Sequence, residues 1–556
     1  MTYGRPRARL SLSAALISAA SISVATVAAA CSTASSVTST SAPKQQHATT
    51  TRPATTTART FPGPYGVESS AIIQQNKLPG TKAWKIFGTP PGFLDAFASL
   101  NYAKVGNTVK LYVSTDASTF RVYAYRMGFY GGDGGRLVWS SVAAKGVSQP
   151  TCPLTGGVNM VTCDNWSSSL SFTVSSAFVS GDYLLKLVGN RGQEGYVPLT
   201  IWDPSSHATY LVIARSLTEQ GWNNWGGYDY YQGEGPCTLG SPAYPPCNRA
   251  RIVSFDRPYN SGDGAADFLS NEFPLVAFAE QHGLDVTYVT DITVDEHPGV
   301  VLHHKALLSL GHDETWTSTE RLAVQKAEAR GVNIVFFGAA AIVRHARLQS
   351  SPLGRDREEV DYRDSSEDPL NGVASPLDVT GNTFGSPPTD WSETSLTGQL
   401  YSGYLEPGEQ PVPLVVYDPS SWLFKGTGLG MGSKVPGVID SDIDHVAPGY
   451  PMPSDLQVLA HSPISLSVAY TNQGQWGGYT YADVTYYTDP TSKAGVFDSG
   501  TTNWICAMST CSWKHGGPGP DVQRMTGNLL RLFGQGPAGA TDPSVANWRS
   551  VTPAGS

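Results

Sequence analysis

The chain has 556 residues, of which 40% are hydrophobic and 15% are charged, and its formal net charge at pH 7 is −9. This length exceeds what one ordinary hydrophobic core organises, so two folded domains with appended segments are expected. The acidic balance, without a basic stripe anywhere in the sequence, excludes the usual electrostatic footprint of a nucleic-acid-binding protein.

The N-terminal residues 1–31 have the organisation of a secretory signal peptide. Three arginines precede a weakly apolar run that ends in small residues before Cys31, which is the pattern of an exported protein. The run Ala-Ala-Ala-Cys resembles a lipoprotein cleavage box, so we favour lipidation of Cys31, with simple cleavage near Ala30 as the alternative. The sequence therefore predicts an extracytoplasmic protein, either a cell-surface lipoprotein held at the membrane by its lipid or a secreted chain.

The six remaining cysteines form three close couples. An oxidising compartment would join them as local disulfides. The couples are Cys152 with Cys163, Cys237 with Cys247, and Cys506 with Cys511. A zinc cluster is not expected, since no CxxC pair with neighbouring histidines is present.

Residues 32–60 are rich in Ser and Thr and predict a flexible tether. Residues 61–203 change to short alternating segments separated by Gly, Asn, Asp or Ser, which predict an antiparallel β-sandwich. The expected strands are 108–115, 120–127, 136–141, 170–176 and 182–189. The aromatic and glycine-rich segment 125–138 is interpreted as a hairpin whose aromatic side chains fill the core, in preference to a carbohydrate-stacking surface.

From residue 204 to about 535 apolar segments alternate with amphipathic ones, which predicts an α/β domain with a parallel sheet. Strands are expected at 208–216, 284–290, 304–310 and 332–338, and helices at 271–283, 318–331 and 525–533. Ser318 is expected to cap the second helix and Gly331 to end it. A flexible tail is expected from 536 to 556.

Three titratable side chains, His312, Asp313 and Glu314, directly follow the strand expected at 304–310. Functional loops gather at the carboxyl ends of parallel strands. Helix capping would explain one acid, at ~0.3–1 kcal/mol, but not the neighbouring histidine. In an extended turn, His312 and Glu314 point the same way, as two arms of one site.

Two other strand-end loops are rich in functional groups. One begins with Trp222 and Asn223, and the other contains Arg257 and Tyr259. Since the loops of such a sheet meet at one edge, we expect them to contribute to one pocket with the histidine and the glutamate.

Several motifs in order resemble the large (beta) subunit of N,N-dimethylformamidase and its wider family. They are GWNNWGG, SFDRPY, LGHDETW, NIVFFGAAAIVRHAR and VFDSGTTNW, with YRMGFYGGDGGRL nearer the N-terminus. The resemblance spans roughly residues 90–533. It implies a β-sandwich followed by a glutamine-amidotransferase-like (flavodoxin-like) α/β domain. The activity it implies is hydrolysis of a small amide at a mononuclear iron held by two tyrosines and one glutamate.

The resemblance carries over residue by residue. Tyr259 matches the second metal-binding tyrosine, Glu314 the carboxylate ligand, and His312 the active-site histidine beside it. A ferric ion favours hard anionic oxygens such as phenolate and carboxylate. It would act as a Lewis acid on the amide carbonyl or lower the pKa of a bound water.

Three positions depart from the family pattern. Trp222 stands where the first metal-binding tyrosine is expected, and an indole cannot ligate a metal. Ala340 occupies the position of an asparagine, and Asp442 replaces a glutamate that is one methylene longer. The candidates to replace the missing tyrosine from a shifted loop are Tyr228, Tyr230 and Tyr231.

Two functions are compatible with this pattern. The first is an exported metal-dependent amidohydrolase in which His312, Arg257 and Asp442 are catalytic and Tyr259 and Glu314 bind iron. The second is a non-catalytic cell-surface protein that binds glycan or cell-wall material through its aromatic loop. We favour the enzyme, because a histidine apposed to a glutamate has no obvious structural use. The expected ligand is a small amide or a glycan, not a nucleic acid, and the sequence is compatible with a homo-oligomer.

Overall fold

The computed structural model describes residues 58–234, 248–471, 478–509 and 519–552. The predicted signal peptide, nearly all of the tether, and Cys31, Cys237, Cys247 and Cys511 lie outside these residues. Within the ranges described, no helix has the length and apolar character needed to cross a bilayer.

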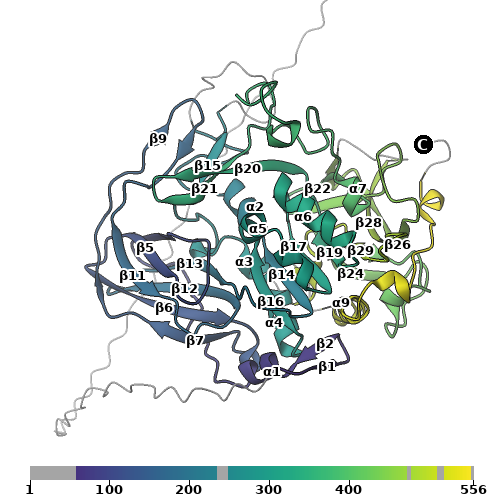
Figure 1. Cartoon of the computed structure of the whole chain (residues 1–556), viewed down its shortest axis with the longest axis horizontal. Helices are drawn as coiled ribbons and strands as arrows, with labels where there is room; N and C mark the ends of the chain where they lie inside the picture. Colours follow the sequence, from purple (N-terminus) through teal and green to yellow (C-terminus); the bar gives the residue numbers. More distant parts are fainter. Residues whose placement is uncertain (1–57, 235–247, 472–477, 510–518, 553–556) are drawn as a thin grey trace, which may run out of the picture. The chain divides into compact units, whose positions relative to one another are not determined.

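Two largely antiparallel sheets make up the N-terminal part of the fold (Figure 1). One contains β3 (Leu94–Ala98), β5 (Thr108–Thr115) and β11 (Ser168–Thr173). The other contains β4 (Tyr102–Ala103), β6 (Thr119–Met127), β7 (Gly135–Ser140), β8 (Ala144–Lys145), β12 (Gly181–Gly189) and β13 (Glu194–Ile201). Alternate apolar residues of both sheets are buried in one shared core, which is why these segments alternate in the sequence.

The aromatic and glycine-rich segment joins two paired strands. Strands β6 and β7 pair in antiparallel fashion, which confirms the hairpin. Tyr130 is buried, and its hydroxyl accepts a hydrogen bond from Nη1 of Arg126 at 2.9 Å. The ring therefore fills the interior, as the sequence analysis favoured, and offers no stacking surface.

The central sheet consists, in the part of the chain that is described, of seven strands in the order β16-β14-β17-β19-β29-β28-β26 (Figure 1). They are β14 (Tyr210–Ala214), β16 (Val286–Thr290), β17 (Ala306–Gly311), β19 (Asn333–Gly338), β26 (Gln457–Ser465), β28 (Tyr479–Thr488) and β29 (Gly495–Asp498). The first five in this order are parallel, and β28 and β26 are antiparallel to their neighbours. In chain order the parallel strands read 2-1-3-4-5, the order of flavodoxin-like sheets.

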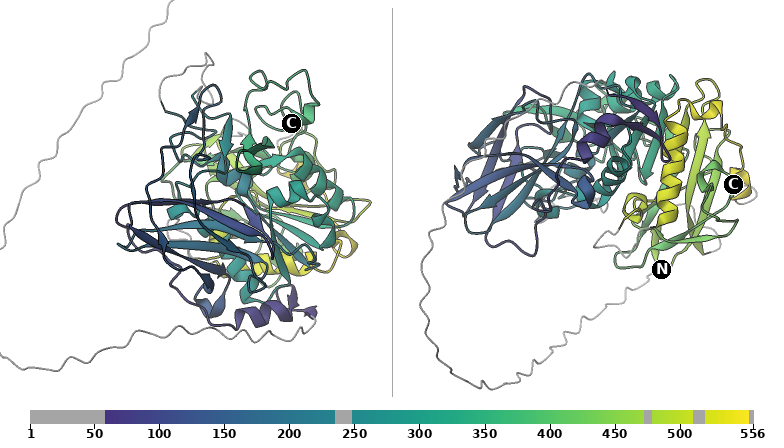
Figure 2. Two further views of the ribbon diagram at one scale, coloured as in Figure 1. Left: turned by 60° about the vertical axis from the view of Figure 1, so that its left-hand side comes forward. Right: turned by 90° about the horizontal axis from the view of Figure 1, so that it is seen from below.

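Both faces of this sheet are covered. Helices α4 (Phe273–Gln281) and α9 (Pro520–Phe533) pack in one hydrophobic core with alternate residues of the strands. Helix α6 (Ser318–Glu328) packs in the core that holds the opposite set. The right-hand view of Figure 2 shows α9, in yellow, running alongside the C-terminal strands. Burial on both faces explains why the parallel strands are almost continuously apolar in sequence.

The remaining elements surround these sheets. Strands β15 (Ile252–Ser254), β18 (Thr315–Thr317), β20 (Arg344–Ser351) and β21 (Gly354–Val360) form one smaller sheet, and β22 (Leu400–Leu405), β25 (Asp442–His445) and β27 (Ala469–Thr471) form another. Three two-stranded pairs are β1 (Thr60–Pro62) with β2 (Val67–Ser69), β9 (Leu154–Thr155) with β10 (Met160–Val161), and β23 (Val412–Val415) with β24 (Lys434–Ile439) among the described residues. Short helices are α1 (Ser70–Asn76), α2 (Ser216–Gly221), α3 (Phe268–Asn271), α5 (Asp291–Glu296), α7 (Thr394–Thr397) and α8 (Trp504–Ala507).

Two details differ from the sequence predictions. Thr317, and not Ser318, caps α6: its Oγ1 accepts a hydrogen bond from the backbone N–H of Glu320 at 3.0 Å, whereas the Ser318 hydroxyl donates to the carbonyl of Leu377. The prediction of a flexible tail was also wrong for residues 536–552. Ala538 is buried, and its backbone N–H donates to the Asn333 side chain at 3.0 Å.

One predicted disulfide is described in full. Cys152 and Cys163 are joined, and Cys163 is buried beside Phe97 and Trp166. Cys506 is also disulfide-bonded, although its expected partner lies outside the described residues.

Candidate functional site

The candidate site lies at the carboxyl ends of β14 and β17. These are strands 1 and 3 in chain order, and they are neighbours in the 2-1-3-4-5 sheet. The strand order reverses between these two strands, and ligands of open α/β sheets bind at such a reversal. β17 ends at Gly311, which has φ +55° and pairs with Gly338 on β19. A Cβ on Gly338 would overlap the carbonyl of Gly311, so this close approach of the two strand ends requires glycine.

The three titratable residues that follow Gly311 divide between two surroundings. His312 and Glu314 line the same cavity, with His312 Nε2 3.5 Å from Glu314 Oε2. Asp313 points into the interior, where its Oδ2 accepts a hydrogen bond from Ser309 Oγ at 2.7 Å. Burial raises the pKa of Asp313 to about 6. The alternation of an extended segment thus places the histidine and the glutamate side by side.

One oxygen of Glu314 is a point of convergence. Its Oε2 accepts hydrogen bonds from Trp222 Nε1 at 2.9 Å and from the Tyr231 hydroxyl at 2.5 Å. The rings of Trp222 and Tyr231 are stacked, with centroids 3.6 Å apart. With His312 close to the same atom, this carboxylate is held by side chains from two strand-end loops.

Tyr231 is enclosed on its other face by Arg363, whose guanidinium lies 4.2 Å from the ring centroid. Burial, and then the neighbouring Glu314 carboxylate, raise the pKa of Tyr231 well above its usual value. Arg363 also donates to the carbonyl of Tyr230 at 2.9 Å. The tyrosine is therefore fixed between an indole and a guanidinium.

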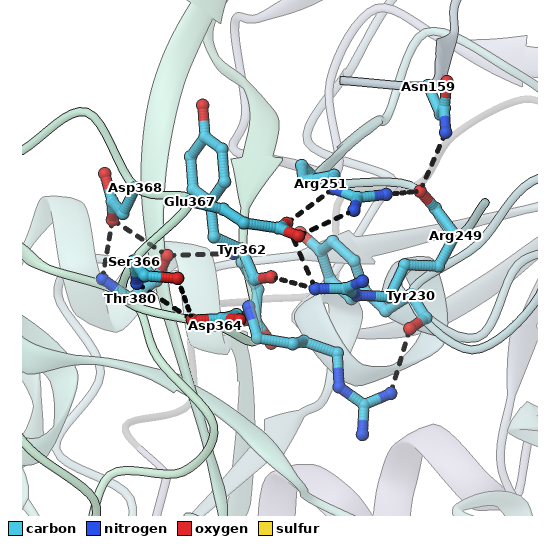
Figure 3. Close-up of polar contacts among 12 residues, drawn as sticks. Asn159, Tyr230, Arg249, Arg251, Tyr362, Asp364, Ser366, Glu367, Asp368 and Thr380 are labelled. Atoms are coloured by element: carbon cyan, nitrogen blue, oxygen red, sulfur yellow. Dashed lines mark hydrogen bonds and ion pairs between the residues drawn. The ribbon is translucent and has the colours of Figure 1, made fainter. Parts of the chain in front are cut away.

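An ion-pair network anchors the neighbouring backbone (Figure 3). Arg251 donates to both carboxylate oxygens of Glu367, at 2.8 and 3.0 Å, and Arg249 donates to the same side chain at 3.3 Å. The Tyr230 hydroxyl donates to the carbonyl of Glu359 at 2.7 Å. These contacts join the loop that carries Tyr231 to the chain that carries Arg363.

The cavity has a volume of about 1060 Å³. Tyr401 on β22 and Asp442 on β25 also line this cavity, and the two strands pair in antiparallel fashion. Asp442 Oδ2 lies 3.9 Å from His312 Nε2. Burial, and then Asp442, raise the pKa of Tyr401 above its usual value. His312 Nε2 therefore has two carboxylates, those of Glu314 and Asp442, within 4 Å.

A second cavity of about 480 Å³ adjoins the first. Five residues line both: Trp222, Gln232, His312, Ser441 and Asp442. The histidine and the aspartate thus form part of the boundary between two spaces.

Other residues predicted for the site lie elsewhere. Tyr259 lines two smaller cavities and neither of those that His312 lines. Burial, and then Glu219, raise its pKa above the usual value. Both Tyr259 and Glu314 are among the described residues, and no hydrogen bond joins them.

Asn223, Arg257 and Ala340 have structural contacts instead. Asn223 Nδ2 donates to the carbonyl of Pro258 at 2.8 Å, and Arg257 donates to the carbonyl of Asn223 at 2.7 Å. The backbone N–H of Ala340 donates to Asp444 at 2.9 Å. The first two contacts hold the strand-end loops together, and none of these three residues lines the two adjoining cavities.

The donor set was compared with the iron centre that the family resemblance implies. Among the described residues, no group of three or more His, Cys, Asp or Glu side chains is arranged to hold a metal ion. Tyr259 and Glu314 are not brought together, but the phenols of Tyr231 and Tyr401 line the cavity with Glu314. Phenol and carboxylate oxygens are the donors that a hard ferric ion prefers. The chemistry of two tyrosines and a glutamate is therefore available from a different pair of tyrosines.

Most of the cavity wall could not be predicted from the sequence. Tyr401, Tyr404 and Tyr470 come from the small sheet β25-β22-β27, far from Glu314 in the chain. Arg344 lines the cavity at the start of β20 and donates to Asp361 at 2.7 Å. No local motif marks these residues, since only the tertiary fold brings them to the strand ends.

The solved structures that match this chain include two with low sequence identity and low TM-scores. A solved structure described as the structural basis of T cell specificity and activation by the bacterial superantigen toxic shock syndrome toxin-1 is 17% identical, with a TM-score of 0.12, over 20% of this chain and 98% of that one. A Paenibacillus sp. cycloisomaltooligosaccharide glucanotransferase complexed with cycloisomaltoheptaose is 10% identical, with a TM-score of 0.15, over 70% of this chain and 68% of that one. TM-scores this low carry no argument about the fold.

The comparison with curated proteins gave no match. The sequence profile described as N,N-dimethylformamidase beta subunit-like, C-terminal, matches residues 121–518. This match spans well over half of the chain and includes every residue that converges on Glu314. The protein belongs to the N,N-dimethylformamidase beta subunit-like family.

Proposed function

We propose that the protein hydrolyses the C–N bond of an amide in the large cavity, with His312 and Glu314 at the reaction centre. The observation that carries the proposal is the convergence of Trp222, Tyr231 and His312 on Glu314 Oε2 at the strand ends. Family membership supports the reaction class.

In this proposal His312 acts as general base. It takes a proton from a water whose oxygen bonds to the amide carbon, and it returns the proton to the nitrogen as the C–N bond breaks. Glu314 and Asp442, at 3.5 and 3.9 Å from Nε2, stabilise the imidazolium between these steps. Arg363 lines the same cavity and supplies positive charge for the oxygen that becomes negative.

An iron ion would be held by Glu314, Tyr231 and Tyr401, and it would supply Lewis acidity toward the carbonyl oxygen. The fold assignment that accompanies the proposal is a β-sandwich followed by a glutamine-amidotransferase-like domain, supported by the shared core of the first two sheets and the 2-1-3-4-5 strand order. An extracytoplasmic location is supported by the Cys152–Cys163 disulfide.

The test is amine release from a panel of linear amides, including formamides, by the purified full chain. Wild type is expected to release amine, and His312→Ala to lose at least about 100-fold in rate, the usual contribution of a general base. Asp203→Asn, an exposed acid that lines neither cavity, should keep the wild-type rate. Absence of amine release from every amide, or an undiminished rate in His312→Ala, would refute the proposal.

A second candidate, glycan binding without catalysis, is favoured by the exposure of aromatic rings at the cavity. Trp222 is 43% exposed and Tyr470 is 49% exposed, and Tyr470 stacks on Tyr404. Such faces suit sugar rings as well as other ligands. Calorimetry with soluble cell-wall oligosaccharides tests this candidate: saturable binding that Trp222→Ala removes, in a chain that releases no amine, would establish it.

A further inference from the structure

The two adjoining cavities are lined by more acidic than basic side chains. Among the described residues that line them, eight are acidic and three are arginines. The acidic ones are Glu219, Asp229, Asp267, Glu314, Glu406, Glu409, Asp440 and Asp442. Clefts lined mainly by one sign of charge raise the local concentration of ligands of the opposite sign.

The arginines are engaged with groups of the protein. Arg215 contacts Glu219 at 2.6 Å and Glu272 at 3.4 Å. Arg344 contacts Asp361 at 2.7 Å. The third, Arg363, is stacked behind Tyr231. Glu219, which pairs with Arg215, is itself one of the eight acids. With that pair set aside, seven acids remain against Arg344 and Arg363, so acidic side chains still outnumber basic ones in the cavity lining.

Aromatic faces accompany this charge in the large cavity. Trp222 is about two-fifths and Tyr470 about half exposed, and Tyr404 stacks on Tyr470 with centroids 5.2 Å apart. The faces of Trp and Tyr carry negative potential and attract ammonium groups. Exposed rings beside carboxylates form the kind of surface that binds organic cations.

The size of the space indicates a ligand larger than a simple formamide. Pockets for drug-sized ligands measure roughly 300–1,000 Å³, and the large cavity alone has about 1060 Å³. His312 and Asp442 line both this cavity and the smaller one of about 480 Å³. A bond positioned at His312 thus has room for substituents on both of its sides.

We infer that the site takes a positively charged organic ligand, and that the substrate is an amide carrying an ammonium group. The inference deepens the proposed function and rests on it for the reaction, whereas the charge preference is a property of binding. The ammonium group would lie against the aromatic rings and carboxylates, with the amide carbon at His312.

The test measures binding of three probes of one shape by calorimetry on the full chain: tetramethylammonium, neutral tert-butanol and anionic pivalate. Tetramethylammonium is expected to bind at least about tenfold more tightly than tert-butanol, because both charge and ring contacts favour it. Pivalate should not bind. Raising the sodium chloride concentration should weaken binding of tetramethylammonium and leave binding of tert-butanol unchanged, since salt screens only charge interactions. Equal affinity for the neutral probe, or preference for pivalate, would overturn the inference.

Variants that neutralise single acids test whether the cavity lining causes the preference for a cation. Asp267→Asn and Glu406→Gln alter acids that line the cavities but that take no part in the proposed reaction, and both should weaken tetramethylammonium binding several-fold. The matched control Asp203→Asn removes an exposed acid outside the cavities and should leave binding unchanged. If the control weakens binding as much as the two variants do, the charge preference belongs to the whole protein and the inference is wrong.

The two proposals fail separately. Tetramethylammonium binding in a chain that hydrolyses no amide would remove the proposed function and keep the cation site. Hydrolysis of neutral amides, with no preference among the three probes, would overturn only the inference of a cationic substrate.

Discussion

At the scale of single residues, Trp222 determines much of the surroundings of Glu314. The indole cannot ligate a metal, yet its N–H donates to the same Glu314 oxygen that Tyr231 contacts. Tyr231 thus supplies a phenol that is hydrogen-bonded to the Glu314 carboxylate. An iron centre in this chain would differ from the set that the family resemblance implies.

Tyr231→Phe is expected to remove iron binding, because it deletes the phenol oxygen beside Glu314. Tyr259→Phe should leave it intact, since Tyr259 lines other cavities. Elemental analysis and the visible phenolate-to-iron absorption band, measured after reconstitution with ferric iron, check both. A band lost in Tyr259→Phe but kept in Tyr231→Phe would return the iron to the ligands predicted from the sequence. Absence of iron from wild type would remove the ion from the proposal.

The sequence revealed part of this arrangement and not the rest. His312 and Glu314 were predictable as neighbours, because they follow a buried strand and lie two residues apart in an extended segment. Tyr231 could not be chosen over Tyr228 and Tyr230, since a sequence does not show which ring of a tyrosine-rich loop faces the cavity. Tyr401 had no local signal, because its strand belongs to a different sheet.

At the scale of elements, strands and helices were predictable wherever burial dictates a pattern. The segment 108–115 was predicted as a strand with the bounds that β5 has, and four parallel strands of the central sheet were located from their apolar runs. The cap of α6 was misplaced by one residue. Thr317 and Ser318 both carry hydroxyls, and only the backbone geometry decides which of them faces the free N–H groups of the helix.

Thr317→Ala should lower the free energy of unfolding by about 1 kcal/mol, the usual contribution of an N-cap. Thr317→Ser keeps the hydroxyl and is expected to stay close to wild type. Urea unfolding followed by circular dichroism measures both variants. Equal stability of Thr317→Ala and wild type would show that the cap contributes nothing.

The buried Asp182 on β12 should make the stability of the fold depend on pH. Burial raises its pKa from 3.8 to about 6, so the folded state binds its proton more strongly than the unfolded state does. The contribution of this group to stability is present below about pH 4 and is lost as the pH rises through about 6, by at most about 3 kcal/mol.

Asp182→Asn removes that titration and retains an acceptor for the Thr200 hydroxyl, which donates to Asp182 Oδ1 at 2.8 Å. Relative to wild type, the variant should therefore gain stability between pH 4 and pH 7.5. Urea unfolding at several pH values compares the two. Parallel stability profiles of variant and wild type would contradict the assigned pKa.

At the scale of the whole molecule, the described residues from 58 onward belong to one compact unit, and the site collects residues from widely separated segments. The cavity wall contains Trp222, Glu314, Arg363, Tyr401 and Tyr470. The parallel sheet and its functional edge could be predicted from periodicity and strand-end loops. The second half of the wall could not, because residues beyond 350 are short strands and turns whose pairing depends on long-range contacts.

The Cys152–Cys163 disulfide should contribute to global stability. It closes a loop of residues separated by 11 in sequence, and a short loop of this kind stabilises by about 2–3 kcal/mol, mainly through the unfolded chain. The double variant Cys152→Ala/Cys163→Ala is expected to lose that amount of unfolding free energy. It should therefore unfold at a lower urea concentration than wild type. An unchanged midpoint would mean that the bond leaves the stability of the fold unaffected.

The central claim is that amide hydrolysis takes place where Trp222, Tyr231 and His312 meet Glu314. Amine release measured side by side for wild type, Glu314→Gln and Tyr259→Phe, with the best amide of the panel, tests it most directly. Glu314→Gln is expected to lose at least about 100-fold in kcat/KM, while Tyr259→Phe stays within a few-fold of wild type. An active Glu314→Gln together with an inactive Tyr259→Phe would contradict the account and place the reaction at the smaller cavities around Tyr259.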